Sequence, residues 1–266
     1  MKFSQVSVSK NDQKAQTPDW MLHWVKETFG NYFDPCPAGP KFDGLKIPWK
    51  KLNYVNPPYD DIASWLDKAV YECKTNNSVS VFFIPFRLHT KYIQRNLNFI
   101  KCSIILNKCV AFKGYSDRLP HALHVCVVGP RSYRLPRCMK GVKKQVSGHI
   151  VPVTNMKSLV AQSTPFCNDI SVLKGKVSEP LSAILKQKTL TKSSSFGVVC
   201  PARLDNRVLY DEGFIKCSTM LFGNQPLKST QGKFIGGTCV LLFGASVPRS
   251  HNSVQLYSMD VNKIIK

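Results

Sequence analysis

The chain has 266 residues, and 37 Lys or Arg against 16 Asp or Glu give it a formal net charge of +21. An excess of this size is typical of proteins that meet a polyanion. Residues 1–11 are polar, and no apolar stretch approaches the ~20 residues of a membrane helix. We therefore expect a soluble, intracellular protein with no membrane partner.

The ten cysteines form no Cys-x-x-Cys pair, and His121 and His124 lie inside an apparent strand. Zinc sites normally show tighter ligand pairs. Reduced thiols in apolar runs pack as small hydrophobic groups. We predict no metal site.

After a polar arm at 1–16, the first expected element is a helix that opens at Thr17-Pro18. Its apolar residues recur at helical spacing, and Gly30 ends it. A short strand at 32–33 then runs into Asp34-Pro35, and a loop follows through Gly39 and Asp43. The apolar residues of the helix are Trp20, Met21, Trp24, Val25 and Phe29.

The next strand, at 52–55, leads into Asn56-Pro57-Pro58-Tyr59. The exocyclic amine of a base is a poor nucleophile unless acceptors hold both of its hydrogens. The Asn56 side chain and the Pro57 carbonyl provide two acceptors on a stiff turn, because proline fixes the backbone and offers no donor. Tyr59 supplies an aromatic face for a base taken out of its stack. The alternative is a plain proline turn capped by a tyrosine.

Alternating elements continue to residue 128. Apolar residues recur at helical spacing between 62 and 70, and 79–86 is a continuous apolar run, as in a buried parallel strand. A short helix at 90–97 and strands at 102–106 and 121–128 complete an α/β pattern that favours a doubly wound sheet. Ligands bind at the carboxyl ends of such strands, where Asn56 and Arg87 both fall. Arg87 either contacts a phosphate or is an ordinary surface arginine.

The motifs Thr17-Pro18, Asp34-Pro35, Asp43-Gly44-Leu45 with Trp49, and Asn56 to Tyr59 follow one another in a fixed order. In this order the chain resembles the S-adenosylmethionine-dependent amino-methyltransferases, most closely the compact phage-type DNA adenine-N6 (Dam-like) enzymes, over about residues 17–129. The resemblance implies a compact, curtailed Rossmann-like methyltransferase fold. It also implies that Thr17, Pro18, Asp34 and Pro35 border the methionine end of the cofactor and that Asn56, Pro57, Pro58 and Tyr59 hold the target amine.

Two positions depart from the family pattern. The glycine-rich loop, Gly-x-Gly in the family, reads Ala38-Gly39-Pro40, so only Gly39 is left to allow a close backbone approach. Asp43 is the candidate for holding the ribose hydroxyls, and an ordinary turn aspartate is the alternative.

A repeat points to a duplicated domain. Residues 82–88 are echoed by 198–204 and 99–103 by 214–218, with Arg203 repeating Arg87. The second copy holds no counterpart of the tetrapeptide, so we infer a decayed copy that binds substrate or pairs with the first. The expected divisions are an arm at 1–16, a catalytic domain at 17–130, a basic linker at 131–146, a degenerate domain at 147–247 and a tail at 248–266.

The basic excess is uneven, with +7 on residues 1–130 and +14 on 131–266. The densest part is the expected linker, and its proline and glycine content argues against a helix. It is either a solvated connection or a phosphate-binding surface. The residues predicted to bind nucleic acid are Arg87, Arg131, Arg134, Arg137, Lys143 and Lys144.

The function predicted from the sequence is methyl transfer from S-adenosylmethionine to the N6 amine of adenine in DNA or RNA. The alternatives are a glutamine-amide methyltransferase and a non-catalytic nucleic-acid-binding protein built on decayed domains. Whether the copies pair within one chain or as a homodimer is left open.

Overall fold

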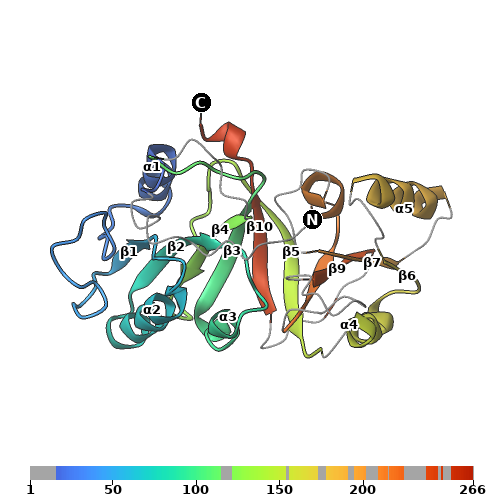
Figure 1. Ribbon diagram of the computed structural model, residues 1–266, viewed down its shortest axis with the longest axis horizontal. Coiled ribbons are helices and arrows are strands. Elements are labelled where there is room, and N and C mark those ends of the chain that lie inside the picture. Colours follow the sequence, from blue (N-terminus) through green and yellow to red (C-terminus); the bar gives the residue numbers. More distant parts are fainter. Residues whose placement is uncertain are drawn as a thin grey trace.

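One mixed sheet of ten strands runs through the chain in the computed structural model (Figure 1). The strand order is β1-β2-β4-β3-β10-β5-β8-β9-β7-β6. The structure describes residues 16–114, 122–153, 156–172, 178–190, 195–201, 209–214, 216–224, 238–244, 247 and 253–265.

Strands β1 to β4 and three helices belong to the first half of the molecule. The helix α1 begins after Pro18 and ends at Gly30, whose φ of 102° suits glycine. Every residue of β2 is buried, as expected of a strand covered on both faces. The elements are α1 (Asp19–Phe29), β1 (Leu52–Val55), α2 (Ile62–Asn76), β2 (Val79–Pro85), α3 (Lys91–Gln94), β3 (Ile100–Leu106) and β4 (Leu123–Val128).

The second half repeats this arrangement. The order β6-β7-β9-β8 matches β1-β2-β4-β3, with the same parallel and antiparallel pairs. In the pairs β1·β2 and β6·β7, partnered residues lie 27 positions apart in the sequence. This agreement supports the predicted duplication. The remaining elements are β5 (Val142–Val151), α4 (Met156–Ser163), β6 (Ile170–Val172), α5 (Ser178–Leu190), β7 (Phe196–Pro201), β8 (Thr219–Gly223), β9 (Thr238–Phe243) and β10 (Ser253–Met259).

The central strands β5 and β10 are exchanged between the halves. β5 follows the first half in the chain but pairs in parallel with β8, whereas β10 follows the second half and pairs in parallel with β3. The two exchanged strands pair with each other in antiparallel fashion. In Figure 1 the red β10 accordingly stands beside the green β3. The halves therefore form one continuous sheet and cannot be separated at a linker.

Two strands cross the expected divisions of the chain. Residues 142–146 of the expected linker form the first part of β5, and the expected tail contains β10. The sheet is mixed, because β4 lies antiparallel between β2 and β3. Residues 131–141 still connect the halves, and they pack Tyr133, Leu135 and Met139 onto the sheet face that α1 covers.

Two layers of side chains cover the sheet. One face carries α2, α3 and α5 over a core that extends across both halves, including Phe82 and Phe222. The other face has separate cores under α1 and under α4. No helix within the described ranges has the length and apolar character needed to cross a bilayer.

Candidate functional site

The double-proline turn joins β1 to α2. It lies at the edge of the sheet where β1, β2 and β3 end, which we call the carboxyl edge. Pro57 is buried and Asn56 is half-buried. The Pro58 carbonyl accepts a hydrogen bond from Asp61 N at 3.1 Å, which leads the chain into α2. Among the described residues, neither the Asn56 side chain nor the Pro57 carbonyl has a hydrogen-bond partner. Both predicted acceptors are therefore without a competing donor in this part of the structure.

Asp34 reaches the same edge through a short parallel bridge between Phe33 and Asn53. Phe33 N donates to Leu52 O and Tyr54 N donates to Phe33 O, both at 2.9 Å. The chain therefore leaves the sheet at Asp34 beside the end of β1. The Asp34 Oδ1 accepts a hydrogen bond from Cys36 N at 2.8 Å. Burial raises the pKa of Asp34, and the hydrogen bond from Cys36 N offsets part of the rise. The resulting pKa is about 6.

Two tyrosine hydroxyls lie beneath this edge, and their environments differ. The Tyr54 hydroxyl is buried and lies 2.9 Å from Thr17 Oγ1. The Tyr59 hydroxyl is buried without a hydrogen-bond partner, and burial raises its pKa while the nearby Arg87 lowers it. The Tyr59 ring stands edge-on to Phe112 at a centroid distance of 6.4 Å. Tyr54 was not among the predicted site residues, and its place within an apolar strand gave no signal.

Thr17 and Pro18 have structural roles in this geometry. Thr17 is 8% exposed and bonds Tyr54, and the Pro18 carbonyl accepts the first backbone hydrogen bonds of α1 from Met21 N and Leu22 N. The resemblance implies that Thr17 and Pro18 border the cofactor, but the buried Thr17 side chain offers little surface to one.

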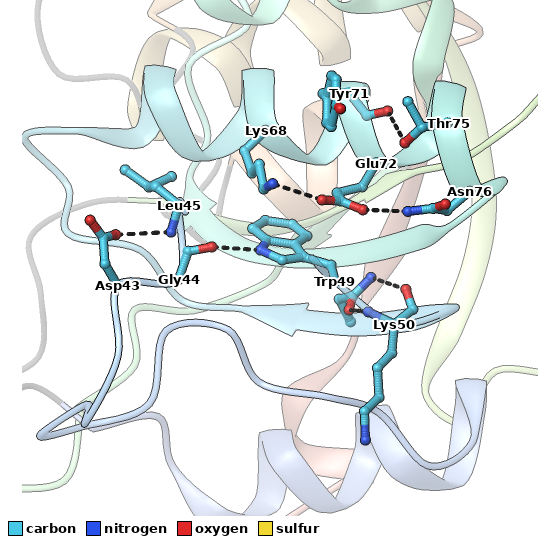
Figure 2. A network of polar contacts seen from close by, with 11 residues as sticks. Asp43, Gly44, Leu45, Trp49, Lys50, Lys68, Tyr71, Glu72, Thr75 and Asn76 are labelled. Carbon is cyan, nitrogen blue, oxygen red and sulfur yellow. Dashed lines mark hydrogen bonds and ion pairs between the residues drawn. The ribbon is translucent and has the colours of Figure 1, made fainter. Parts of the chain in front are cut away.

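The segment Asp43-Gly44-Leu45 with Trp49 fastens the loop after Asp34 to the sheet and to α2 (Figure 2). Trp49 Nε1 donates to the Gly44 carbonyl at 2.8 Å, and the Trp49 ring stacks on Trp65. A Cβ at Gly44 would stand 1.9 Å from the Pro35 carbonyl oxygen, so only glycine fits. The motif is thus explained by packing.

Asp43 is exposed and its carboxylate is engaged. Its Oδ1 accepts a hydrogen bond from Leu45 N at 3.0 Å, and its Oδ2 pairs with Lys46 Nζ at 3.3 Å. Both contacts are local and are typical of a turn aspartate, the alternative to a ribose-binding residue. Gly39 has a φ of +64° and open space around it, so it serves a turn and does not line a tight cradle. Pro35 is buried and lies against Gly44.

A buried carboxylate on α2 completes the fastening, as Figure 2 shows. Glu72 is 1% exposed and accepts hydrogen bonds from Lys68 Nζ and Asn76 Nδ2, both at 2.7 Å. Burial raises the pKa of Glu72, but these hydrogen bonds and one from the Trp49 backbone outweigh it, so the pKa lies below its ordinary value.

The predicted basic residues do not form one surface. Arg87 follows β2 at the carboxyl edge, exposed and close enough to lower the pKa of Tyr59. Arg131 and Arg134 follow β4 at the opposite edge, where β1, β2 and β3 begin. Because β2 has seven residues, the two edges are about 20 Å apart.

The other members of the basic set lie elsewhere. Arg137 lines a shallow cavity of about 330 Å³ with Val142 and Tyr257. Lys143 is exposed on β5, and the Lys144 side chain lies outside the described part of the structure. The Arg203 corner of the second copy is outside it as well.

A groove of about 740 Å³ lies at the start of β1, away from Asn56. Its lining residues are Asn31, Tyr32, Phe33, Trp49, Lys50, Lys51, Leu52 and Asn76. It is therefore not the cofactor site that the resemblance implies. Within the described ranges, His, Cys, Asp and Glu form no group of three or more placed to hold a metal ion.

No family model, curated protein or solved structure matches this chain. The resemblance to amino-methyltransferases therefore rests on the ordered motifs alone.

Proposed function

We propose that the chain transfers a methyl group from S-adenosylmethionine to the exocyclic N6 amine of adenine in nucleic acid, with its site at the carboxyl edge of β1. The observation that carries the proposal is a set of polar groups left without partners there. Buried polar groups in native proteins are nearly always hydrogen-bonded. Among the described residues, the buried Tyr59 hydroxyl and the half-buried Asn56 amide, three positions before it, are both unpaired.

The Asn56 carbonyl oxygen and the Pro57 carbonyl would each accept one hydrogen of the target amine. This arrangement keeps the nitrogen oriented and lets its lone pair point away from the base. Because neither acceptor has a competing donor among the described residues, no internal hydrogen bond has to break when a base enters. Tyr59, which is half-buried as a residue, would contact the base.

Asp34 would hold the positive end of the cofactor. Its Oδ1 bonds Cys36 N, and only one of its two oxygens is engaged in this way. A cation near the half-buried carboxylate would favour its charged form, against the burial that raises its pKa. The donor's part is to supply an electrophilic methyl group on a sulfonium. Asp43 does not contribute, because its two oxygens serve the turn and Lys46.

The test is transfer of labelled methyl groups to adenine-containing DNA and RNA and to a protein pool, after calorimetric titration with S-adenosylmethionine. We expect binding of the donor, label on N6-methyladenine and no transfer by Asn56→Ala. Asn262→Ala, an exposed asparagine outside the site, is the matched control and should retain full activity. Unchanged transfer by a folded Asn56→Ala would exclude the site.

The open Gly39 loop and the engaged Asp43 favour a second candidate, a nucleic-acid-binding protein that has lost the cofactor. Titration separates the two, since this candidate predicts nucleic-acid binding with no heat of binding for S-adenosylmethionine.

A further inference from the structure

Six basic side chains gather along the edge of the sheet opposite the candidate site, where β1, β2 and β3 begin. We call this surface the basic edge. Four of its members lie outside the basic set predicted from the sequence. The basic edge consists of Lys50, Lys51, Lys74, Lys101, Arg131 and Arg134.

Hydrogen bonds fix both ends of the basic edge to the sheet. From the β1 side, the Lys51 carbonyl accepts a hydrogen bond from Val79 N at 2.8 Å, and Lys51 Nζ donates to the Asn76 carbonyl at 2.5 Å. From the β3 side, Lys101 Nζ donates to the Arg131 carbonyl at 3.2 Å. The strands between them are held in register, because Val128 of β4 pairs with both β2 and β3.

No carboxylate neutralises this surface within the described structure. None of the six residues takes part in an ion pair there. Arg131 and Arg134 are exposed. Burial and the nearby charge of Arg134 both lower the pKa of Lys101. Unpaired cations crowded in this way would be relieved by an anion that spans several of them.

The groove at the start of β1 adjoins the basic edge, and aromatic residues are among those that line it. Tyr32, Phe33 and Trp49 contribute to its wall, and Lys50 Nζ lies 5.6 Å from the centre of the Phe33 ring. Phe42 stacks on Phe33 at a centroid distance of 6.2 Å and is 37% exposed. Aromatic rings beside lysines are the combination that binds unstacked bases and their phosphates.

We propose that the basic edge binds single-stranded nucleic acid, with phosphates along Lys51, Lys101, Arg131 and Arg134 and a base in the groove beside Phe33. A single strand is favoured over a duplex because the groove wall offers stacking surfaces that paired bases cannot reach. The inference rests on the nucleic-acid partner of the proposed function but not on methyl transfer. Binding is measured directly, without cofactor, so failure of one proposal leaves the other standing.

The test is fluorescence anisotropy with a labelled 20-nucleotide oligo(dT) between 50 and 500 mM salt. Because each phosphate contact with a single strand contributes about 0.7 to the slope of log K against log salt, Lys101→Gln with Arg131→Gln and Arg134→Gln should reduce that slope by about 2. The charge-matched control changes three exposed lysines elsewhere, Lys91, Lys157 and Lys263, to Gln. It should reduce the slope by less than 0.5.

Should the triple variant fold poorly, Arg134→Gln alone should reduce the slope by about 0.7, since its exposed side chain makes no hydrogen bond within the described residues. Equal slopes for the edge variant and the control would overturn the proposed surface.

The groove has its own test. An abasic strand of equal length has the same phosphates without bases, and we expect it to bind at least tenfold more weakly than oligo(dT). Equal affinity would overturn the role of the groove. Tighter binding to a 20-base-pair duplex, or equal competition by anionic phospholipid vesicles, would overturn the choice of single strands.

Discussion

Replacing Tyr59 by Phe should make the free protein more stable. The Tyr59 hydroxyl is buried and has no hydrogen-bond partner. An unsatisfied buried polar group destabilises a protein by about 1–3 kcal/mol, and Tyr59→Phe removes it without changing the ring. For a chain of this size each kcal/mol shifts Tm by about 2–4 °C, so we expect a rise of roughly 2–12 °C.

Tyr54→Phe is the matched control, because the Tyr54 hydroxyl is equally buried but bonds Thr17 at 2.9 Å. Its loss leaves Thr17 Oγ1 unpaired, so stability should fall by about 1–3 kcal/mol. Thermal unfolding followed by circular dichroism measures both variants. If the Tyr59 hydroxyl serves a ligand, Tyr59→Phe should also weaken donor or substrate binding by roughly two- to tenfold, the value of one net hydrogen bond. A Tyr59→Phe protein that melts below the wild type would refute the reasoning.

Three further variants test other parts of the structure. The pKa of about 6 for folded Asp34 lies above its unfolded value, so the folded state keeps a proton that the unfolded state loses between about pH 4 and 6. Stability should therefore fall by up to about 3 kcal/mol as pH rises through that window, and Asp34→Asn should abolish this part of the slope in urea titrations. Gly44→Ala, which brings a Cβ to 1.9 Å from the Pro35 carbonyl oxygen, should destabilise the fold by about 1–3 kcal/mol or more, and a neutral effect on Tm would contradict the close packing. A chain ending at residue 247 lacks β10 and should aggregate or unfold, whereas a soluble product with native circular dichroism would show that β3 and β5 can do without it.

The sequence predicted the local parts of this structure well. Helical spacing predicted α1 and α2, the continuous apolar run predicted β2, and the double proline predicted the turn after β1. The repeat between the halves was also visible, because residues 82–88 and 99–103 recur as 198–204 and 214–218. These features depend on residues near one another in the chain or on patterns that recur within it.

Long-range pairings were not predictable in the same way. β10 alternates intermediate and buried residues, as an ordinary strand does, and nothing in its sequence says that its neighbour is β3, 153 residues earlier in the chain. The antiparallel placement of β4 depends likewise on strands far from it in the sequence. The Asp43 prediction was undecided for a different reason, since a turn carboxylate and a ribose ligand look alike until the partners Leu45 and Lys46 are seen.

The exchange of β5 and β10 has a consequence for biosynthesis. While a ribosome is still translating residues before 253, β3 has no β10 beside it. β5 is likewise open on the side that β10 later occupies. Two strand edges are then open together, a condition that invites pairing between neighbouring nascent chains until β10 fills the gap between them.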